Sequence, residues 1–111
     1  APDCPQGEIE CEGDVAKGKS YLDKVLANDP ADPSALNNLG NLSYGDGRYE
    51  AAADYYNKAS AADPYDSGIW LNRARAAMKL KNTAEAAEFV NKAATIDPSI
   101  QGIGEMLLHQ D

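Results

Sequence analysis

Few side chains in this chain of 111 residues are of the types that most often carry covalent chemistry. The single histidine, His109, lies near the carboxyl end with no neighbouring cysteine or serine to form a nucleophile and base pair. A terminal histidine of this kind is normally solvated. The sequence also contains no glycine-rich phosphate loop and no cluster of metal ligands. It therefore predicts a protein that is not an enzyme and that needs no cofactor or metal.

The only cysteines, Cys4 and Cys11, stand seven residues apart in the segment APDCPQGEIEC. A disulfide requires Cα atoms within about 7 Å, whereas a continuous helix would hold two such residues about 10 Å apart. Pro2, Pro5 and Gly7 already interrupt a helix here. We therefore favour a loop closed by a disulfide, which requires an oxidising compartment. The alternative is two free thiols in a cytoplasmic protein.

The first residues bear on location as well. The chain begins with alanine and not methionine, as it would after cleavage of a signal peptide, although a shortened chain would begin in the same way. Together with the cysteine pair, this start predicts an exported protein, either periplasmic or extracellular. A cytoplasmic location is the alternative.

Side chains suited to noncovalent binding are more numerous. Asn37, Asn38 and Asn41 lie close together, and because each amide offers donors and an acceptor, a row of them can bond to the backbone of an extended peptide. The alternative is that these amides are merely solvated. The cations Arg75 and Lys79 stand out in a chain with a formal charge of −8. They are suited to an acidic side chain, and simple solvation is an equally good interpretation.

The composition argues against two classes of partner. With 18 acidic and 10 basic residues, the chain lacks the cationic surface that binding to nucleic acid requires. Its longest apolar runs are three or four residues, far short of the roughly 20 that a membrane-spanning helix needs. We therefore expect neither nucleic-acid binding nor membrane insertion.

A fixed period organises the chain. The Asp-Pro pairs that end at Pro30, Pro64 and Pro98 recur every 34 residues. Each unit reads as two helices, because apolar and small residues recur at helical spacing on both sides of a turn such as GDG. Asn82 and Glu85 have the spacing of a capping box at the start of a second helix. Because proline ends a helix and restricts the residue before it, the Asp-Pro pairs mark boundaries between units.

Small residues in these helices predict close packing. The first helix of one unit places Leu36, Leu39 and Ser43 on its inward side. Four alanines are expected at close contacts between helices, where a larger side chain would overpack the core. These residues are Ala52, Ala59, Ala86 and Ala93.

The repeated unit resembles the tetratricopeptide repeat. The first full unit matches that family's pattern at Leu36, Leu39, Gly40, Gly47, Tyr49, Ala52, Tyr56, Ala59 and Pro64. The second matches it at Trp70, Ala74, Ala86, Ala93 and Pro98, although Arg73 stands where leucine is commonest. The resemblance implies an all-α solenoid of antiparallel helix pairs, with two full repeats and a partial repeat at each end.

We expect a single domain over residues 1–111, divided by this period into five parts. These are a disulfide-type loop at 1–12, a partial repeat at 13–32, full repeats at 33–66 and 67–100, and a capping helix at 101–111.

The resemblance also implies a non-enzymatic protein-interaction module, which we expect to act as an exported scaffold or assembly factor. In this family the first helix of each pair lines a concave groove that holds a peptide or protein segment. The groove residues expected from helical phase are Asn37, Asn38, Asn41, Tyr44, Leu71, Asn72, Arg75, Met78 and Lys79. Because Asn41 and Asn72 lie outside the packing stripe, their replacement is expected to weaken binding with little loss of stability.

Some members of the family grip a terminal carboxylate with two lysines, an arginine and two asparagines. Asn41 and Asn72 match the two asparagine positions, but Asn37, Gly102 and Met106 stand where the cations should be. A clamp without its cations lacks the charge-assisted hydrogen bonds on which it depends. We therefore favour general peptide binding over binding of a chaperone tail.

A different class of function remains open at the carboxyl end. In the segment IQGIGEMLLHQD, Ile103, Met106 and Leu107 have helical spacing. This helix either caps the core or offers its apolar face to a second copy of the chain. In the second case the protein is a structural homo-oligomer that assembles through its terminal helices.

The cysteine interpretation can be tested by mass. If Cys4 and Cys11 form a disulfide, the intact protein is two hydrogens lighter before reduction than after it. Removal of the bond is expected to cost at most about 2 to 3 kcal/mol, because the closed loop is short. Two freely alkylated thiols in protein purified from an oxidising compartment would contradict the disulfide.

Overall fold

The computed structural model describes residues 12–109, with side chains in the first helix from residue 18 onward. Cys4 and Cys11 lie outside these residues, and their disulfide stays a prediction. Every regular element within residues 12–109 is helical, which confirms the all-α prediction. The elements are α1 (Glu12–Asn28), α2 (Pro33–Gly45), α3 (Tyr49–Ala62), α4 (Ser67–Lys79), α5 (Thr83–Ile96), the 3₁₀ helix η1 (Pro98–Ile100) and α6 (Gln101–Leu108).

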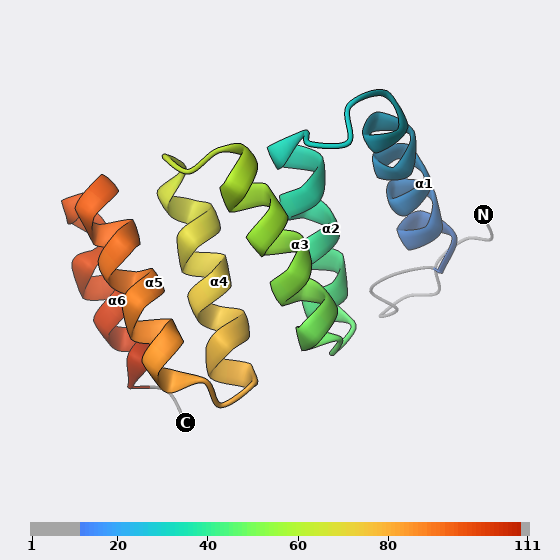
Figure 1. Cartoon of the computed structure of the whole chain (residues 1–111). Helices are drawn as coiled ribbons and strands as arrows, with labels where there is room; N and C mark the ends of the chain where they lie inside the picture. Colours follow the sequence, from blue (N-terminus) through green and yellow to red (C-terminus); the bar gives the residue numbers. More distant parts are fainter. Residues whose placement is uncertain (1–11, 110–111) are drawn as a thin grey trace.

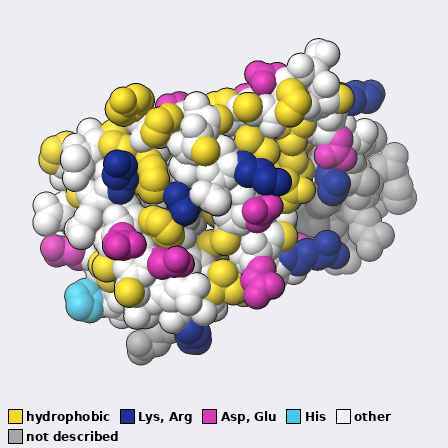
Figure 2. All heavy atoms as spheres, in the orientation of Figure 1, with side chains coloured by type: hydrophobic (Ala, Val, Ile, Leu, Met, Phe, Trp, Pro, Cys, Tyr) yellow, Lys and Arg dark blue, Asp and Glu magenta, His cyan; other side chains and the backbone are white. Residues whose placement is uncertain are grey.

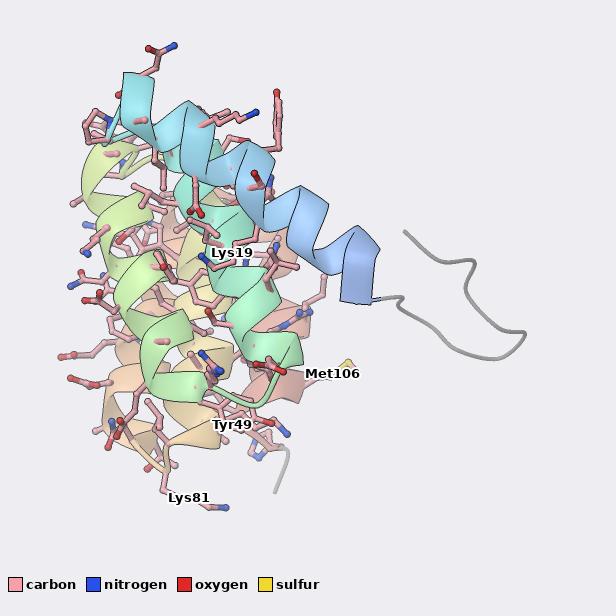
Figure 3. The ribbon with its side chains drawn as sticks, turned by 90° about the vertical axis from the view of Figure 1, so that its right-hand side faces the viewer. Lys19, Tyr49, Lys81 and Met106 are labelled. Atoms are coloured by element: carbon pink, nitrogen blue, oxygen red, sulfur yellow. The ribbon has the colours of Figure 1, made fainter. Side chains whose placement is uncertain are left out.

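The helices stack in chain order as antiparallel neighbours (Figure 1). From α1 to α6 each α-helix packs on the next one, and α6 also contacts α4. Seen along the stack, α3 and α5 lie on one side of the molecule, and α2 and α6 lie on the other (Figure 3). This arrangement is an α-solenoid.

Aspartates begin the first helix of each full repeat. The Asp32 carboxylate accepts a hydrogen bond from the Ser34 backbone N–H at 3.1 Å, and Pro33 occupies the first helical turn. In the next repeat the Asp66 carboxylate accepts from the Gly68 N–H at 2.9 Å. These bonds satisfy backbone donors that have no partner within the helix.

The predicted capping box at α5 is wrong in its bonding. Asn82 does occupy the N-cap position, but its side chain makes no capping hydrogen bond. A capping box also needs the Asn82 backbone N–H as the donor to Glu85. That N–H already donates to the Ala77 carbonyl at 2.8 Å within the turn. The tight turn between α4 and α5 therefore takes the donor that the box requires.

The two turns within the repeats share a left-handed residue. Gly47 has φ 79° after α2, and Lys81, which follows it by one period, has φ 66° after α4. Glycine adopts this conformation freely, whereas a residue with a Cβ atom is disfavoured by about 1 to 2 kcal/mol. Lys81 therefore carries strain that Gly47 avoids, and its exposed side chain projects away from the helices (Figure 3).

The interior is built largely from small residues. Ala52, Ala59, Ala86 and Ala93 are all 0 % exposed, which confirms their predicted place at close helix contacts. Leu36 and Leu39 are also buried, as expected, while Ser43 is only partly buried. Alanine at these points lets the helix backbones approach each other closely.

The closest packing is between Gly40 of α2 and the Tyr56 ring of α3. A Cβ atom added to Gly40 would lie 2.5 Å from Cε1 of Tyr56, a distance that no real structure tolerates. Tyr56 is only 2 % exposed. Glycine is therefore required at position 40 because the aromatic ring lies directly on the α2 backbone.

Arg73 occupies the position where the family prefers leucine, and the structure shows how it is accommodated. Its guanidinium carbon lies 4.1 Å from the centre of the Phe89 ring and 4.9 Å from that of Trp70. Its Nη1 donates to the Ser60 Oγ at 3.2 Å. Burial lowers the pKa of Arg73, although the nearby Glu85 carboxylate acts in the opposite direction. The arginine thus replaces apolar packing by stacking on aromatic rings.

The last helix both caps the core and exposes apolar surface. Leu107 is 9 % exposed and packs with Ala77 and Val90 of the preceding pair. Ile103 is 54 % exposed and Met106 is 69 % exposed, and Met106 projects away from the body of the molecule (Figure 3). One side of α6 therefore packs on the core and the other side exposes apolar side chains, and self-association through the exposed side stays a prediction.

Charged groups of both signs are interspersed over the face that carries α3 and α5 (Figure 2). Glu88 of α5 is exposed. Among the helices of residues 12–109, none combines the length and the apolar character needed to cross a bilayer.

Replacement of Gly40 by alanine tests the contact with Tyr56. Gly40→Ala should lower the free energy of unfolding by roughly 1 to 3 kcal/mol through overpacking, less the roughly 0.5 to 1 kcal/mol that alanine contributes in a helix. Gly18→Ala is the matched control, because a Cβ atom there meets nothing within 4 Å. Gly18→Ala should be mildly stabilising in urea denaturation.

A double variant separates the clash from a general loss of helix stability. The second repeat has Ala74 and Val90 at the positions of Gly40 and Tyr56. Gly40→Ala combined with Tyr56→Val should therefore be less destabilising than the sum of the two single changes. Strict additivity would mean that the ring and the Gly40 backbone are not in the contact described.

Candidate functional site

The nine residues expected to face a groove come from the two first helices of the full repeats. We refer to them as the α2–α4 face. Asn37, Asn38, Asn41 and Tyr44 belong to α2, and Leu71, Asn72, Arg75, Met78 and Lys79 belong to α4. Asn38, Asn41, Arg75 and Lys79 are exposed, and the other five are half-buried.

One amide pair joins the two helices of this face. The Asn72 Nδ2 group donates to the Asn37 Oδ1 atom at 2.9 Å. The bond links residues 35 apart in the chain and brings the neighbouring repeats together at this point. The Asn37 Nδ2 group and the Asn72 Oδ1 atom take no part in this bond.

A second hydrogen bond fixes the amide of Asn41. The Tyr56 hydroxyl donates to the Asn41 Oδ1 atom at 2.6 Å. Because Oδ1 is occupied, the Nδ2 group of this exposed side chain is left to donate outward. The bond connects the buried ring that lies on Gly40 to the surface of α2, so the core of the repeat orients an amide on the α2–α4 face.

The environment of Tyr56 strongly favours its neutral form. Burial raises the pKa of the Tyr56 phenol to about 12, the nearby Tyr44 adds to the rise, and Arg75 acts in the opposite direction. A neutral hydroxyl is the form that donates to Asn41. The phenol therefore remains a hydrogen-bond donor over the whole physiological pH range.

These bonds correct one expectation from the sequence. Asn41 and Asn72 were expected to be replaceable with little loss of stability, but the Tyr56 hydroxyl depends on Asn41 for its partner. Asn41→Ala would leave a buried hydroxyl without that partner, at a cost of about 1 to 3 kcal/mol. Asn72→Ala would remove the link to Asn37. The amides are therefore part of the packing as well as of the surface.

Cations and aromatic rings gather at the end of the face where α2 and α4 terminate. The Lys79 ammonium lies 5.7 Å from the centre of the Tyr49 ring, and the Tyr49 and Tyr44 rings meet edge to face with centres 5.2 Å apart. Arg75 lies one turn before Lys79 on α4 and close enough to Tyr56 to affect its pKa.

Three other cations in the described part of the chain have acidic partners. Lys19 pairs with Asp23, Arg48 with Asp46, and Lys58 with Asp54, at 3.1 to 3.3 Å. Among the side chains that the structure describes from residue 18 to residue 109, Arg75 and Lys79 take part in no ion pair, and the same holds for Lys24, Arg73, Lys81 and Lys92. The list of residues that form ion pairs there is Lys19, Asp23, Arg48, Asp46, Lys58 and Asp54.

A cavity of about 460 Å³ opens beside Asn41, between α1 and the end of α2. Lys19 reaches it from α1, beside α2 (Figure 3), and Arg48 reaches it from the turn after α2. The sequence did not single out either residue. Period alignment alone gives the face of each helix, but these contacts depend on how α1 crosses α2.

The opposite side of the molecule has a separate cavity of about 300 Å³ between α3 and α5. Arg73 and Phe89 line it together with the acidic residues Glu50, Asp54 and Glu85. His109 is exposed at the end of α6, as expected for a solvated terminal histidine. Within residues 12–109, no group of three or more histidine, cysteine, aspartate or glutamate residues has an arrangement suited to a metal ion.

Comparisons with known proteins agree with the repeat architecture. One model of the tetratricopeptide repeat matches residues 12–67, and a second model of that repeat matches residues 43–101. The two matches overlap and together run from the start of α1 to the first residue of α6. No curated protein matched the chain.

The raised pKa of Tyr56 predicts a specific alkaline loss of stability. The phenol ionises near pH 10 in the unfolded chain and near 12 in the fold, so its contribution is complete below pH 10 and is lost as the pH rises through 12. At one pKa unit per 1.36 kcal/mol, the loss is on the order of 2 kcal/mol. Urea denaturation at pH 9 and at pH 11.5 should show it as a difference between the wild type and Tyr56→Phe.

Tyr65→Phe is the control for this measurement, because Tyr65 is 81 % exposed. Its stability should fall with pH as that of the wild type does, whereas Tyr56→Phe should fall less. An equal decline in all three proteins would mean that the Tyr56 phenol does not titrate late.

Proposed function

The chain belongs to the tetratricopeptide repeat family, whose repeats generally mediate interactions between proteins, and we propose that its α2–α4 face binds an extended segment of another protein. Members of this family are typically non-enzymatic. The proposed ligand lies along the first helices of the two full repeats, across the Asn37–Asn72 pair and past Asn41.

The fixed orientation of the amides carries this proposal. An extended segment has backbone N–H and C=O groups that must be satisfied when it leaves water. The Asn72–Asn37 bond and the Tyr56–Asn41 bond hold three amides in place before any ligand arrives. Preorganised groups lose less side-chain entropy on binding than free ones, so their bonds contribute more to affinity.

The cavity beside Asn41 supports the same surface. At about 460 Å³, it is in the size range of sites that hold a small ligand or a side chain. Asn41 is one of its lining residues, and Leu42 adds an apolar wall. A segment bonded to Asn41 through its backbone can place a neighbouring side chain in this cavity.

The second candidate function is self-association through α6. The observation that favours it is the exposure of Ile103 and Met106, at 54 % and 69 %. A homo-oligomer built in this way would show a mass that rises with protein concentration, and it would lose this dependence in Met106→Gln. A monomer that retains peptide binding favours the α2–α4 face.

We also propose that the module works outside the cytoplasm, as an exported scaffold or assembly factor. The cysteine pair supports this proposal, because a disulfide persists in an oxidising compartment.

The groove proposal is tested by selecting binders from a library of random peptides and measuring them against single variants. Asn41→Asp keeps an oxygen for the Tyr56 hydroxyl but removes the outward Nδ2 donors. Loss of such a hydrogen bond is worth about 1 to 3 kcal/mol, so the selected peptides should bind this variant about tenfold more weakly or worse.

Asn91→Asp is the matched control. Asn91 is exposed on α5, so the variant makes the same chemical change away from the α2–α4 face and should leave peptide binding unchanged. Thermal denaturation checks that both variants fold. Peptides that bind Asn41→Asp as tightly as the wild type, or a library that yields no binder, would refute the groove proposal.

A further inference from the structure

The charge on the α2–α4 face differs from that of the chain as a whole. The chain carries a formal charge of −8, yet the charged side chains of this face are Arg75 and Lys79, both exposed. They stand one helical turn apart, where two like charges repel each other on an isolated helix. Neither cation forms an ion pair with a side chain described between residues 18 and 109, so an anion placed between them would relieve this repulsion.

Tyrosine side chains lie next to the two cations. The Tyr49 ring lies under the Lys79 ammonium, and Tyr44 packs edge to face on Tyr49. Near Arg75, burial keeps the Tyr56 phenol neutral by raising its pKa to about 12. The Tyr56 proton is already donated to Asn41, so the charged donors at this end of the face are the Lys79 ammonium and the Arg75 guanidinium, which suit a carboxylate better than a neutral or cationic group.

The cations are separated from the amide pair along α4. Asn72 lies in the first half of the helix, whereas Arg75 and Lys79 lie in the second half. At the amide pair the Asn72 and Asn37 side chains bond to each other and offer no charge. A segment that crosses the pair with its backbone therefore reaches the cations with a side chain further along its length.

Apolar side chains are found on α4 and on the neighbouring helix α6. Met78 is half-buried on the same face and packs on the core cluster that contains Leu107. Met106 follows Asn72 by one period, and its 69 % exposed side chain projects from α6, which contacts α4. Methionine adapts its shape to varied apolar partners.

We propose that the bound segment is acidic and apolar, and that the protein reads it through an internal aspartate or glutamate held between Arg75 and Lys79. A large apolar side chain close to this acid packs against Met78 and Met106. The protein does not recognise the terminal carboxylate of the partner chain. This inference rests on the proposed function, since it names the chemistry of the segment that the α2–α4 face binds.

The test repeats the selection from the random-peptide library with charge-reversed proteins. The wild type should enrich peptides that contain an acid near a large apolar residue. The double variant Arg75→Glu with Lys79→Glu should enrich basic peptides instead. The double variant Lys24→Glu with Lys58→Glu changes the net charge equally at exposed positions of α1 and α3, and it should still enrich acidic ones.

Synthetic peptides taken from the wild-type selection give the quantitative readout. Changing the acid to its amide should weaken binding about tenfold or more at low salt, and the difference should shrink as salt is raised. Amidation of the peptide's own carboxyl terminus should leave binding unchanged. The inference would be overturned if amidation of the peptide's carboxyl terminus abolished binding. It would also be overturned if the wild type enriched acidic and basic peptides equally.

The outcomes distinguish this inference from the proposed function on which it rests, peptide binding by the α2–α4 face. Peptides that lose affinity for Asn41→Asp but show no acidic preference would overturn the acidic reading and leave groove binding intact. Peptides that are indifferent to Asn41→Asp would refute both.

Discussion

The contact between the Tyr56 ring and the backbone at Gly40 is the constraint on which the first full repeat depends. Because the ring lies where a Cβ atom would be, α2 and α3 approach each other closely, and the ring lies against the α2 backbone. There the hydroxyl meets Asn41. This one contact in the core therefore sets both the separation of α2 and α3 and the orientation of the Asn41 amide.

The second repeat meets the same spatial requirement with different residues. Ala74 and Val90 stand at the positions of Gly40 and Tyr56, and both are buried. A small residue still faces a larger one, but valine has no hydroxyl that could bond to a side chain of the first helix. Arg75, which stands at the position of Asn41, therefore has no such partner from its own repeat and remains an exposed cation. The two repeats share a fold because their packing volumes are complementary, and they differ in surface chemistry because the larger residue differs.

Much of the fold could be predicted from the sequence because the period of 34 residues carries it. The helical class and the four wholly buried alanines follow from periodic spacing. Spacing within one helix could not reveal bonds between helices. The Tyr56 bond to Asn41 and the stacking of Arg73 depend on atoms contributed by neighbouring elements.

The cavity beside Asn41 was missed for a similar reason. Lys19 and Arg48 belong to a helix and a turn that no periodic argument brings together. The capping box failed because a local rule ignored a competing backbone bond in the turn between α4 and α5. Sequence reasoning therefore predicted which face each helix presents, and it could not predict how side chains on adjoining faces bond to one another.

The period breaks at the last helix, and this break shapes the surface of α6. Ile100 stands where Asp66 caps α4, and an isoleucine cannot accept the N-terminal hydrogen bonds. Asp97 instead accepts from the Ser99 N–H and starts the 3₁₀ turn that leads into α6. Ile103, which follows the buried Ile69 by one period, is then exposed beside Met106. Because the acidic segment and a second copy of the chain would both cover Met106, partner binding and self-association through α6 are expected to exclude each other.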